Sequence, residues 1–325
     1  MSSATPRERA GMLVQQGRVS EALLILNQAA ARNDPAALFD LAVWRLSGQF
    51  VPRDLSLSRE LFRRAAEAGH VEGARIFNAF LANGTGGTAD WEAAIALLRR
   101  RAASDPAAEK QLAIIEAMTL SQQGDPKTLP ASRVLSGSPH VELFAKAFTP
   151  AECAFLVQAA EPLMQPAVTV HPQTGQQLRN PIRTSDAAGF PLALENPAIH
   201  ALNRRIAALS GLPATHGEPL QVLRYRPGQE YRAHSDALPG TDNQRVVTVL
   251  VYLNDGFQGG ETRFLANGLS VRGEVGDVLL FRNVKPDGRP DERATHAGLP
   301  VRSGVKLIAS RWIRAKPLSL AGPPG

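Results

Sequence analysis

The C-terminal half of the chain is a series of short apolar runs separated by glycine-containing turns, and this pattern restricts the fold most. The runs cover residues 220–225, 246–253, 261–264, 276–281 and 305–314. Short runs separated by glycine predict strands of an all-β sandwich or jelly roll. The run 246–253 is apolar on both faces, so we expect it to be a central strand.

The first 118 residues have a helical pattern instead. Alanine and leucine recur at helical spacing, for example within residues 22–30. The segment 34–70 returns about 36 residues later as 72–105, and a period of this length with two helices per unit indicates a helical solenoid. Residues 65–70 resemble the Sel1-like branch of tetratricopeptide repeats, which commonly present a concave face to a peptide. A plain helical bundle remains the alternative.

The pattern between these parts predicts the domain organisation. Residues 119–139 are rich in turn-forming residues and are predicted to be a linker. A short strand at 141–145 and a helix started by the capping box of Thr149 and Glu152 follow. A second helix is expected at about 197–210. We therefore expect a helical repeat domain at 1–118, a β domain with supporting helices at 140–318, and a tail at 319–325.

Composition and charge limit which partners and which cellular compartment we expect. The net charge of the 325-residue chain is +6, but the arginines are scattered among acids, so a nucleic-acid partner is not expected. The one cysteine, Cys153, permits no intramolecular disulfide, which favours a reducing compartment, and we expect a cytoplasmic protein. Neither a signal-peptide pattern nor an apolar run of about 18 residues is found, so we expect no membrane association.

Three residues form a candidate metal site. His234 and Asp236 lie two apart at the end of a predicted strand, so both point to one face. His296 follows the predicted strand 276–281. Two histidines and one carboxylate are the facial triad of non-haem iron(II) oxygenases. The acids Glu261 and Asp277 each follow glycine, in positions typical of turns, and are not expected to be ligands.

Lys306 lies inside the last apolar run. Even positions of this run share one face, which places Lys306 beside Ile308, Ser310 and Trp312. If that face is interior, the ammonium group needs an anion beside it. A metal triad with a buried lysine suggests a co-substrate that chelates the metal at one end and carries a free carboxylate at the other. An edge-strand lysine that points to water remains the alternative.

Several of these parts occur in the order of a known family. Residues 140–315 resemble the catalytic domain of prolyl 4-hydroxylases, which belong to the 2-oxoglutarate- and iron(II)-dependent dioxygenases. The resemblance rests on residues 221–236, 250–255, 259–262 and 296–306. It implies a double-stranded β-helix in which His234, Asp236 and His296 hold iron. It also implies that Lys306 pairs with the distal carboxylate of 2-oxoglutarate and that the Tyr225 hydroxyl assists.

The resemblance also implies the reaction. 2-Oxoglutarate and O₂ are consumed, succinate and CO₂ are released, a prolyl residue of a peptide or protein is hydroxylated, and ascorbate serves as reductant. Arg183 and Ser185 resemble the R-x-S segment with which the family contacts its substrate. They follow the long polar loop 169–181, which together with 283–295 is a candidate lid. The helical repeats are expected to hold the substrate or a separate partner.

Other functions stay open on the sequence alone. The motifs specify iron and co-substrate but not the acceptor, so a free amino acid, a small molecule or another residue type could be hydroxylated. A binding protein with an inactive oxygenase domain, and a cupin-like site with zinc for non-redox chemistry, are further alternatives. The remaining histidines are expected to be surface or structural residues. These are His70, His140, His171, His200 and His216.

Overall fold

The computed structural model describes residues 4–170, 177–179 and 182–318, and these fall into two compact units. One unit holds the chain up to Ile115 together with Leu192–His200, and the other holds Glu116–Pro191 and Ala201–Leu318. The predicted tail, His171 and most of the candidate lid at 169–181 lie outside the described residues. Within the described part, no helix is long and apolar enough to cross a membrane.

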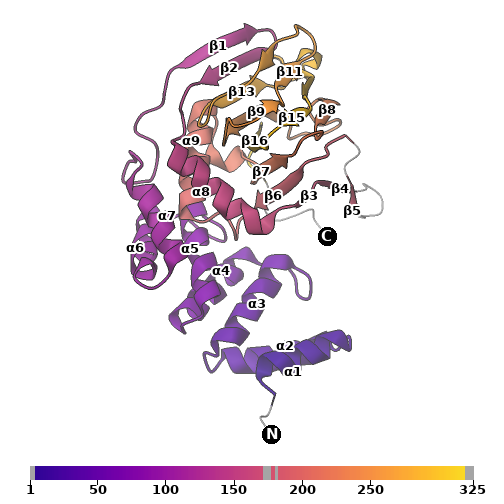
Figure 1. The fold of residues 1–325 in the computed structure, drawn as a ribbon. Helices are drawn as coiled ribbons and strands as arrows, with labels where there is room; N and C mark the ends of the chain where they lie inside the picture. The colour runs from indigo at the N-terminus through magenta and orange to yellow at the C-terminus, as the bar shows by residue number, and fades with distance from the viewer. Residues whose placement is uncertain (1–3, 171–176, 180–181, 319–325) are drawn as a thin grey trace. The chain divides into compact units, whose positions relative to one another are not determined.

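Helices account for the first unit, as its sequence predicts. They are α1 (Pro6–Gln15), α2 (Val19–Ala30), α3 (Pro35–Ser47), α4 (Leu55–Glu67), α5 (Val71–Asn83), α6 (Trp91–Ala102) and α7 (Pro106–Glu116) (Figure 1). The apolar sides of α1 to α5 meet in a core that includes Leu38, Phe62 and Phe80.

The sequence repeat reappears in the residues that begin and end these helices. Helices α3 and α5 both end at a glycine with positive φ, Gly48 and Gly84, where a left-handed residue stops a helix easily. Helices α4 and α6 both begin after an aspartate, Asp54 and Asp90, whose carboxylate accepts a backbone N–H of the first turn. The matching caps relate the pairs α3–α4 and α5–α6, whereas a solenoid with a binding face stays a prediction.

Antiparallel strands make up most of the second unit. A large eight-stranded sheet has the order β1 (Ser132–Gly137), β2 (His140–Phe144), β13 (Val278–Arg282), β9 (Arg245–Tyr252), β16 (Lys306–Arg314), β7 (Leu220–Tyr225), β6 (Asp186–Phe190) and β3 (Gln165–Pro166). A smaller sheet has the order β12 (Ser270–Val271), β11 (Thr262–Phe264), β14 (His296–Gly298) and β8 (Tyr231–His234). Two further pairs are β10 (Gln258–Gly259) with β15 (Val301–Ser303) and β4 (Val168–Val170) with β5 (Gln177–Arg179).

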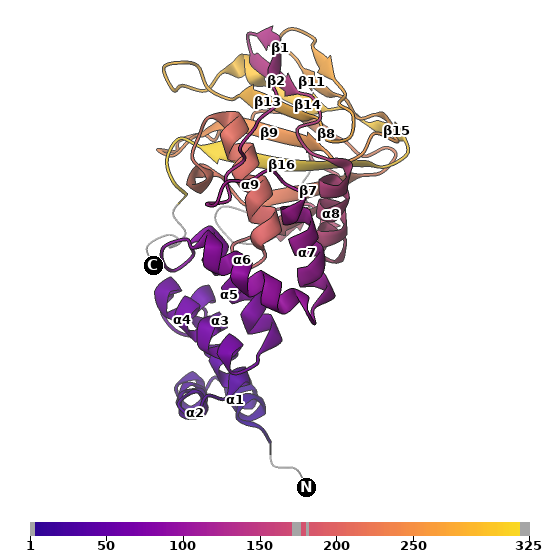
Figure 2. The same ribbon diagram turned by 90° about the vertical axis from the view of Figure 1, so that its left-hand side faces the viewer.

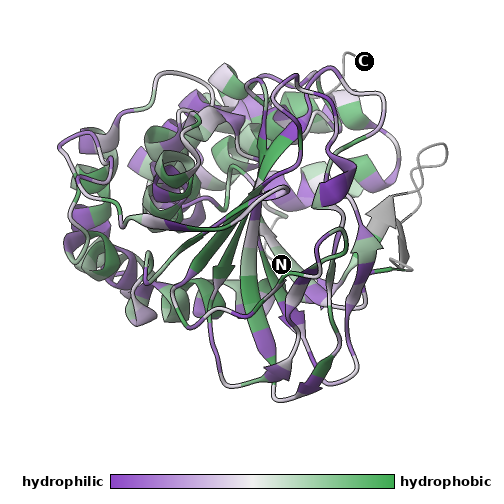
Figure 3. Cartoon of the chain, turned by 90° about the horizontal axis from the view of Figure 1, so that it is seen from above, coloured by the Kyte–Doolittle hydropathy of each residue, from purple (hydrophilic) through white to green (hydrophobic). Residues whose placement is uncertain are grey.

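The two larger sheets pack face to face, which gives the jelly-roll arrangement. Phe264 of the small sheet meets Phe281 of the large sheet edge to face, with ring centroids 5.1 Å apart. Both rings belong to one buried cluster that also contains Tyr252 and Ile308. Figure 3 accordingly shows the central strands coloured hydrophobic along most of their length.

Helices α8 (Pro150–Ala160) and α9 (Pro197–Ser210) support the other face of the large sheet. Figure 1 shows them on one side of the strands with β8 and β11 on the opposite side, and in Figure 2 α9 lies in front of the strands. The predicted capping box of Thr149 and Glu152 starts α8. The Glu152 carboxylate also accepts two hydrogen bonds from Arg205 of α9, at 2.7 and 2.8 Å, so the two helices are joined by a bidentate ion pair.

Most predicted strands form within a residue or two of their expected bounds, and β9 is central, between β13 and β16, as predicted. The linker prediction at 119–139 needs a correction, because residues Ser132–Gly137 form β1. This strand is exposed or half-buried along its length and lies at the edge of the sheet. It therefore lacks the apolar alternation by which strands are found in a sequence. Cys153 is fully buried, as expected, and burial raises the pKa of its thiol to about 12.

Gly276, which precedes β13, is expected to tolerate no side chain. Its φ is +86°, and an added Cβ would lie 2.0 Å from the carbonyl oxygen of Phe148. Gly268 is the matched control, because its φ is +71° but an added Cβ would meet nothing. We expect Gly268→Ala to lower the free energy of unfolding by about 1–2 kcal/mol, and Gly276→Ala to lower it clearly more. Thermal unfolding of the full chain measures this, and equal losses would contradict the backbone clash.

Candidate functional site

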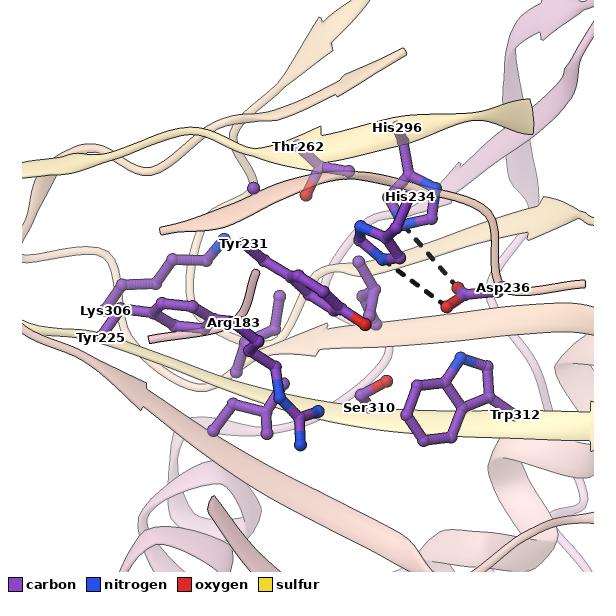
Figure 4. Close-up of a pocket in the computed structure, with 14 residues that line it drawn as sticks. Arg183, Tyr225, Tyr231, His234, Asp236, Thr262, His296, Lys306, Ser310 and Trp312 are labelled. Carbon is purple, nitrogen blue, oxygen red and sulfur yellow. Dashed lines mark ion pairs between the residues drawn. The ribbon is translucent and has the colours of Figure 1, made fainter. Parts of the chain in front are cut away.

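A cavity opens between the two larger sheets of the second unit. Six of the seven residues predicted from the sequence line it, namely Arg183, Tyr225, His234, Asp236, His296 and Lys306 (Figure 4). Ser185 is buried but is not among the lining residues. Residues far apart in the sequence thus meet in one pocket.

Strand pairing brings the two histidines together. His234 ends β8, His296 begins β14, and the two are direct partners in the antiparallel ladder. Asp236 follows β8 by two residues. Its Oδ1 lies 3.6 Å from Nε2 of His234, and its Oδ2 lies 3.7 Å from Nε2 of His296. In the part of the chain that the structure describes, this is the one group of three such side chains placed to hold a metal ion.

Backbone carbonyl groups orient both imidazole rings. Nδ1 of His234 lies 2.7 Å from the carbonyl oxygen of Arg232, and Nδ1 of His296 lies 3.0 Å from that of Ala294. A carbonyl oxygen only accepts, so each Nδ1 carries a hydrogen, and in the neutral ring Nε2 then has a free lone pair. Both lone pairs are available on the side of Asp236, as in metal-bound histidines whose second nitrogen is held by a carbonyl group.

The surroundings also favour the protonation states that bind metal. Burial and the neighbouring His296 lower the pKa of His234 to about 4, so its ring is neutral at physiological pH. Burial alone would raise the pKa of Asp236, but His296, His234 and a hydrogen bond from Thr248 outweigh it and hold that pKa below its ordinary value. Two imidazoles and one carboxylate are a donor set that suits iron(II) with open coordination positions.

Lys306 lies at the other end of the cavity. It is buried, its Nζ donates to the carbonyl oxygen of Gly260 at 2.7 Å, and burial lowers its pKa to about 8. Among the described residues, no carboxylate lies within ion-pair distance of this ammonium group. The alternative of a lysine that points to water is therefore wrong. The even positions Ile308, Ser310 and Trp312 line the same cavity, as predicted.

Tyr225 and Arg183 complete the predicted set. Tyr225 is the direct strand partner of Lys306, and burial raises the pKa of its hydroxyl to about 12, so the hydroxyl keeps its proton and can donate. Arg183 lies next to β8, with its guanidinium carbon 5.6 Å from the ring centroid of Tyr231. The segment is held there by backbone hydrogen bonds, including one from Arg232 to the carbonyl oxygen of Ile182 at 2.8 Å.

Sequence reasoning gave no role to Trp312, although it placed the residue on the correct face. Its indole is almost completely buried, and its Nε1–H has no hydrogen-bond partner among the described residues. The guanidinium carbon of Arg245 lies 3.8 Å from the ring centroid, and Glu218 holds this guanidinium with two hydrogen bonds. The signal that could have identified Trp312 is its even position in the run 305–314, which places it on the same face as Lys306.

The competing residues have structural partners. Asp277 accepts the backbone N–H groups of Lys146 and Glu274 and so shapes the turn before β13. The described histidines outside the triad cap a helix or contact a nearby group. His70 caps α5, His140 contacts Glu142, His200 contacts Glu195, and His216 contacts the carbonyl oxygen of Arg314.

Comparison with known proteins gives a consistent family. Residues 220–314 match the sequence model of the 2OG-Fe(II) oxygenase superfamily. Prolyl 4-hydroxylase 1 of Arabidopsis thaliana is 37% identical over 206 residues, which cover 57% of this chain and 72% of that protein. Probable prolyl 4-hydroxylase 10 of the same plant is 32% identical over 222 residues, covering 60% and 76%.

The chain is also similar to solved structures. The viral collagen prolyl hydroxylase of Paramecium Bursaria Chlorella virus-1, solved as a 2OG complex, is 29% identical, with a TM-score of 0.44. The match covers 54% of this chain and 96% of that one.

The triad geometry predicts metal binding that depends on His296. We expect the full chain to bind Mn(II), a redox-stable substitute for iron(II), and His296→Ala to weaken binding by more than about 100-fold because one of three donors is lost. His200→Ala is the matched control, since that histidine is also buried but contacts Glu195 away from the cavity. Calorimetric titration measures the affinities, and equal affinities of the two variants would contradict the assignment.

Proposed function

Because the chain belongs to the prolyl 4-hydroxylase family of 2-oxoglutarate- and iron(II)-dependent oxygenases, we propose that it hydroxylates a prolyl residue in a peptide or protein. One oxygen atom of O₂ enters the C–H bond of the acceptor and the other enters succinate, with release of CO₂. The observation that carries this proposal is the single cavity with the His–Asp–His triad at one side and the buried Lys306 at the other.

The triad, Lys306 and Tyr225 each have a defined task in the proposal. His234, Asp236 and His296 hold the iron, which together with 2-oxoglutarate and O₂ supplies the oxidising chemistry. Lys306 binds the distal carboxylate of 2-oxoglutarate, because a buried ammonium group requires a paired anion. Tyr225, beside Lys306 in the ladder and protonated, donates a hydrogen bond at the same end.

The part of the cavity that Trp312 and Arg183 line suits a prolyl acceptor. Trp312 and Arg183 carry hydrogen-bond donors and no acceptor. A proline residue has a carbonyl group but no backbone N–H, so a peptide segment around it offers acceptors in excess of donors. The aromatic rings of Tyr231 and Trp312 give the apolar pyrrolidine ring a surface to pack against.

The helical unit is proposed to hold the peptide or protein substrate. The repeated caps of α3–α4 and α5–α6 support a repeat architecture of the kind that binds peptides. Ascorbate as the reductant rests on the resemblance to the family. A reducing, cytoplasmic location rests on the single cysteine, which is buried.

The decisive experiment separates the co-substrates from the acceptor. We expect anaerobic addition of iron(II) and then 2-oxoglutarate to give a visible charge-transfer band, which His234→Ala lacks because a ligand is missing. His216→Ala should keep the band, because this histidine contacts the carbonyl oxygen of Arg314 and does not line the cavity. With O₂, proline-rich peptides should gain one oxygen atom, measured by mass spectrometry, as succinate forms. Oxygen transfer to another residue type or to a free amino acid, with none to proline, would contradict the prolyl acceptor.

The pKa of Lys306 gives a pH dependence. Burial lowers this pKa to about 8 in the free protein, and pairing with a carboxylate raises it again. Binding of 2-oxoglutarate is therefore strongest below pH 8, and its affinity should fall by about tenfold per pH unit above that, with uptake of one proton. Calorimetry in two buffers of different ionisation enthalpy measures the uptake.

Lys306→Met provides the control for this dependence. It should bind 2-oxoglutarate much more weakly and show no proton uptake at pH 9, because the titrating group is gone. A wild-type affinity that is flat between pH 7 and about pH 9.5 would argue against the role of Lys306.

A further inference from the structure

A buried chain of hydrogen bonds lies behind the carboxylate of Asp236. Oδ2 of Asp236 accepts from the hydroxyl of Thr248 at 2.7 Å, and this hydroxyl accepts from Nδ2 of Asn283 at 2.9 Å. Thr248 lies on β9, and Asn283 comes directly after β13. The side chains of Thr248 and Asn283 are 1% exposed, so neither hydrogen bond competes with water.

The direction of these hydrogen bonds is fixed by chemistry. An ionised carboxylate only accepts, so the single hydroxyl proton of Thr248 must point at Asp236. The hydroxyl can then only accept on its other side, which requires the NH₂ group of Asn283 and not its carbonyl oxygen to face it. Asn283 thereby sets the orientation of the hydroxyl that binds the metal ligand.

The hydrogen bond also distinguishes the two oxygens of Asp236. Both lie near an imidazole, Oδ1 at 3.6 Å from His234 and Oδ2 at 3.7 Å from His296. The Thr248 hydroxyl occupies a lone pair of Oδ2 and leaves those of Oδ1 free. Without it, the carboxylate would lose the hydrogen bond that restricts its rotation.

Backbone hydrogen bonds connect Asn283 to the segment that orients His296, a second residue of the triad. Its carbonyl oxygen accepts the N–H of Asp291 at 2.9 Å, and the carbonyl oxygen of Asp291 accepts the N–H of Ala294 at 2.9 Å in the short helix η3 (Glu292–Ala294). The carbonyl oxygen of Ala294 is the group that orients Nδ1 of His296. The amide N–H of Asn283 donates to Val246 at 3.0 Å, which ties this point to β9.

We propose that Asn283 is a positioning residue of the metal centre, which fixes the carboxylate of Asp236 through Thr248 and, through its backbone, anchors the segment that orients His296. Asn283 does not line the cavity and is not one of the three residues of the triad, so it acts only through other groups. The inference rests on the metal-binding role of the triad in the proposed function, but it is independent of the acceptor.

The test is a double-mutant cycle on Mn(II) affinity in the full chain, measured by electron paramagnetic resonance without 2-oxoglutarate or peptide. Thr248→Val removes the hydroxyl at nearly constant volume and should weaken Mn(II) binding by about 10-fold or more, whereas Thr248→Ser should stay within about threefold. Asn283→Leu should weaken binding by roughly fivefold. The double variant should bind no more weakly than Thr248→Val alone, because the side chain of Asn283 acts through that hydroxyl.

Controls separate positioning from loss of fold. Thr85→Val removes a buried hydroxyl of the helical unit and should leave Mn(II) affinity unchanged. Melting temperatures of the metal-free variants report folding. If Asn283→Leu does not fold, Asn283→Ser replaces it in the cycle, because the serine side chain is too short to reach Thr248.

The outcomes are distinguishable. Wild-type affinity in Thr248→Val, or losses in the double variant equal to the product of the single losses, would overturn the proposed route through Thr248. Failure of the wild-type chain to bind Mn(II) at all would instead overturn the metal site, and with it the proposed function.

Discussion

The antiparallel pairing of β8 with β14 is the interaction on which the site depends. It places His234 directly opposite His296, although 61 residues separate them in the sequence, and Asp236 then needs only the first turn after β8 to reach both. Side chains alternate along a strand, so a slip of one residue would turn one histidine out of the cavity. Phe264 and Phe281 pack against the ring of His296, with centroids 5.8 and 4.6 Å away, so a slip that turned this histidine out would also break that packing.

The cavity is polar at both ends although apolar residues surround it. Asp236 and Lys306 are both buried, and in the described part of the chain Asp236 forms no ion pair with a lysine or arginine and Lys306 forms none with a carboxylate. Buried charges without such partners lower the stability of the fold, and they persist where ligands complete them. A metal ion beside Asp236 and a carboxylate beside Lys306 would do so. The site is thus arranged for two ligands of opposite charge, which agrees with iron(II) and 2-oxoglutarate.

Local periodicity explains how much of this could be predicted from the sequence. The alternation in 305–314 placed Lys306 and Trp312 on one face, and H-x-D spacing placed two ligands together, because both depend on neighbours along one strand. The roles of Thr248 and Asn283 depend on the register between β9 and β13 and on the path of the chain after Asp236. No local pattern encodes these. Strand β1 was not predicted for a related reason, because an exposed edge strand has no buried face that shows in the sequence pattern.

Strand β16 fixes the spacing of the residues along the cavity. Lys306 and Trp312 lie at the two ends of the part of β16 that lines the pocket. They are six residues apart, and this separation corresponds to roughly 20 Å of extended chain. The strand is hydrogen-bonded on both sides, to β9 and β7, so it cannot stretch or shift without breaking two ladders. The combined length of co-substrate, metal and acceptor is therefore set by the backbone itself. The separation between a carboxylate bound by Lys306 and an acceptor beside Trp312 thus follows from the spacing of peptide units in one strand.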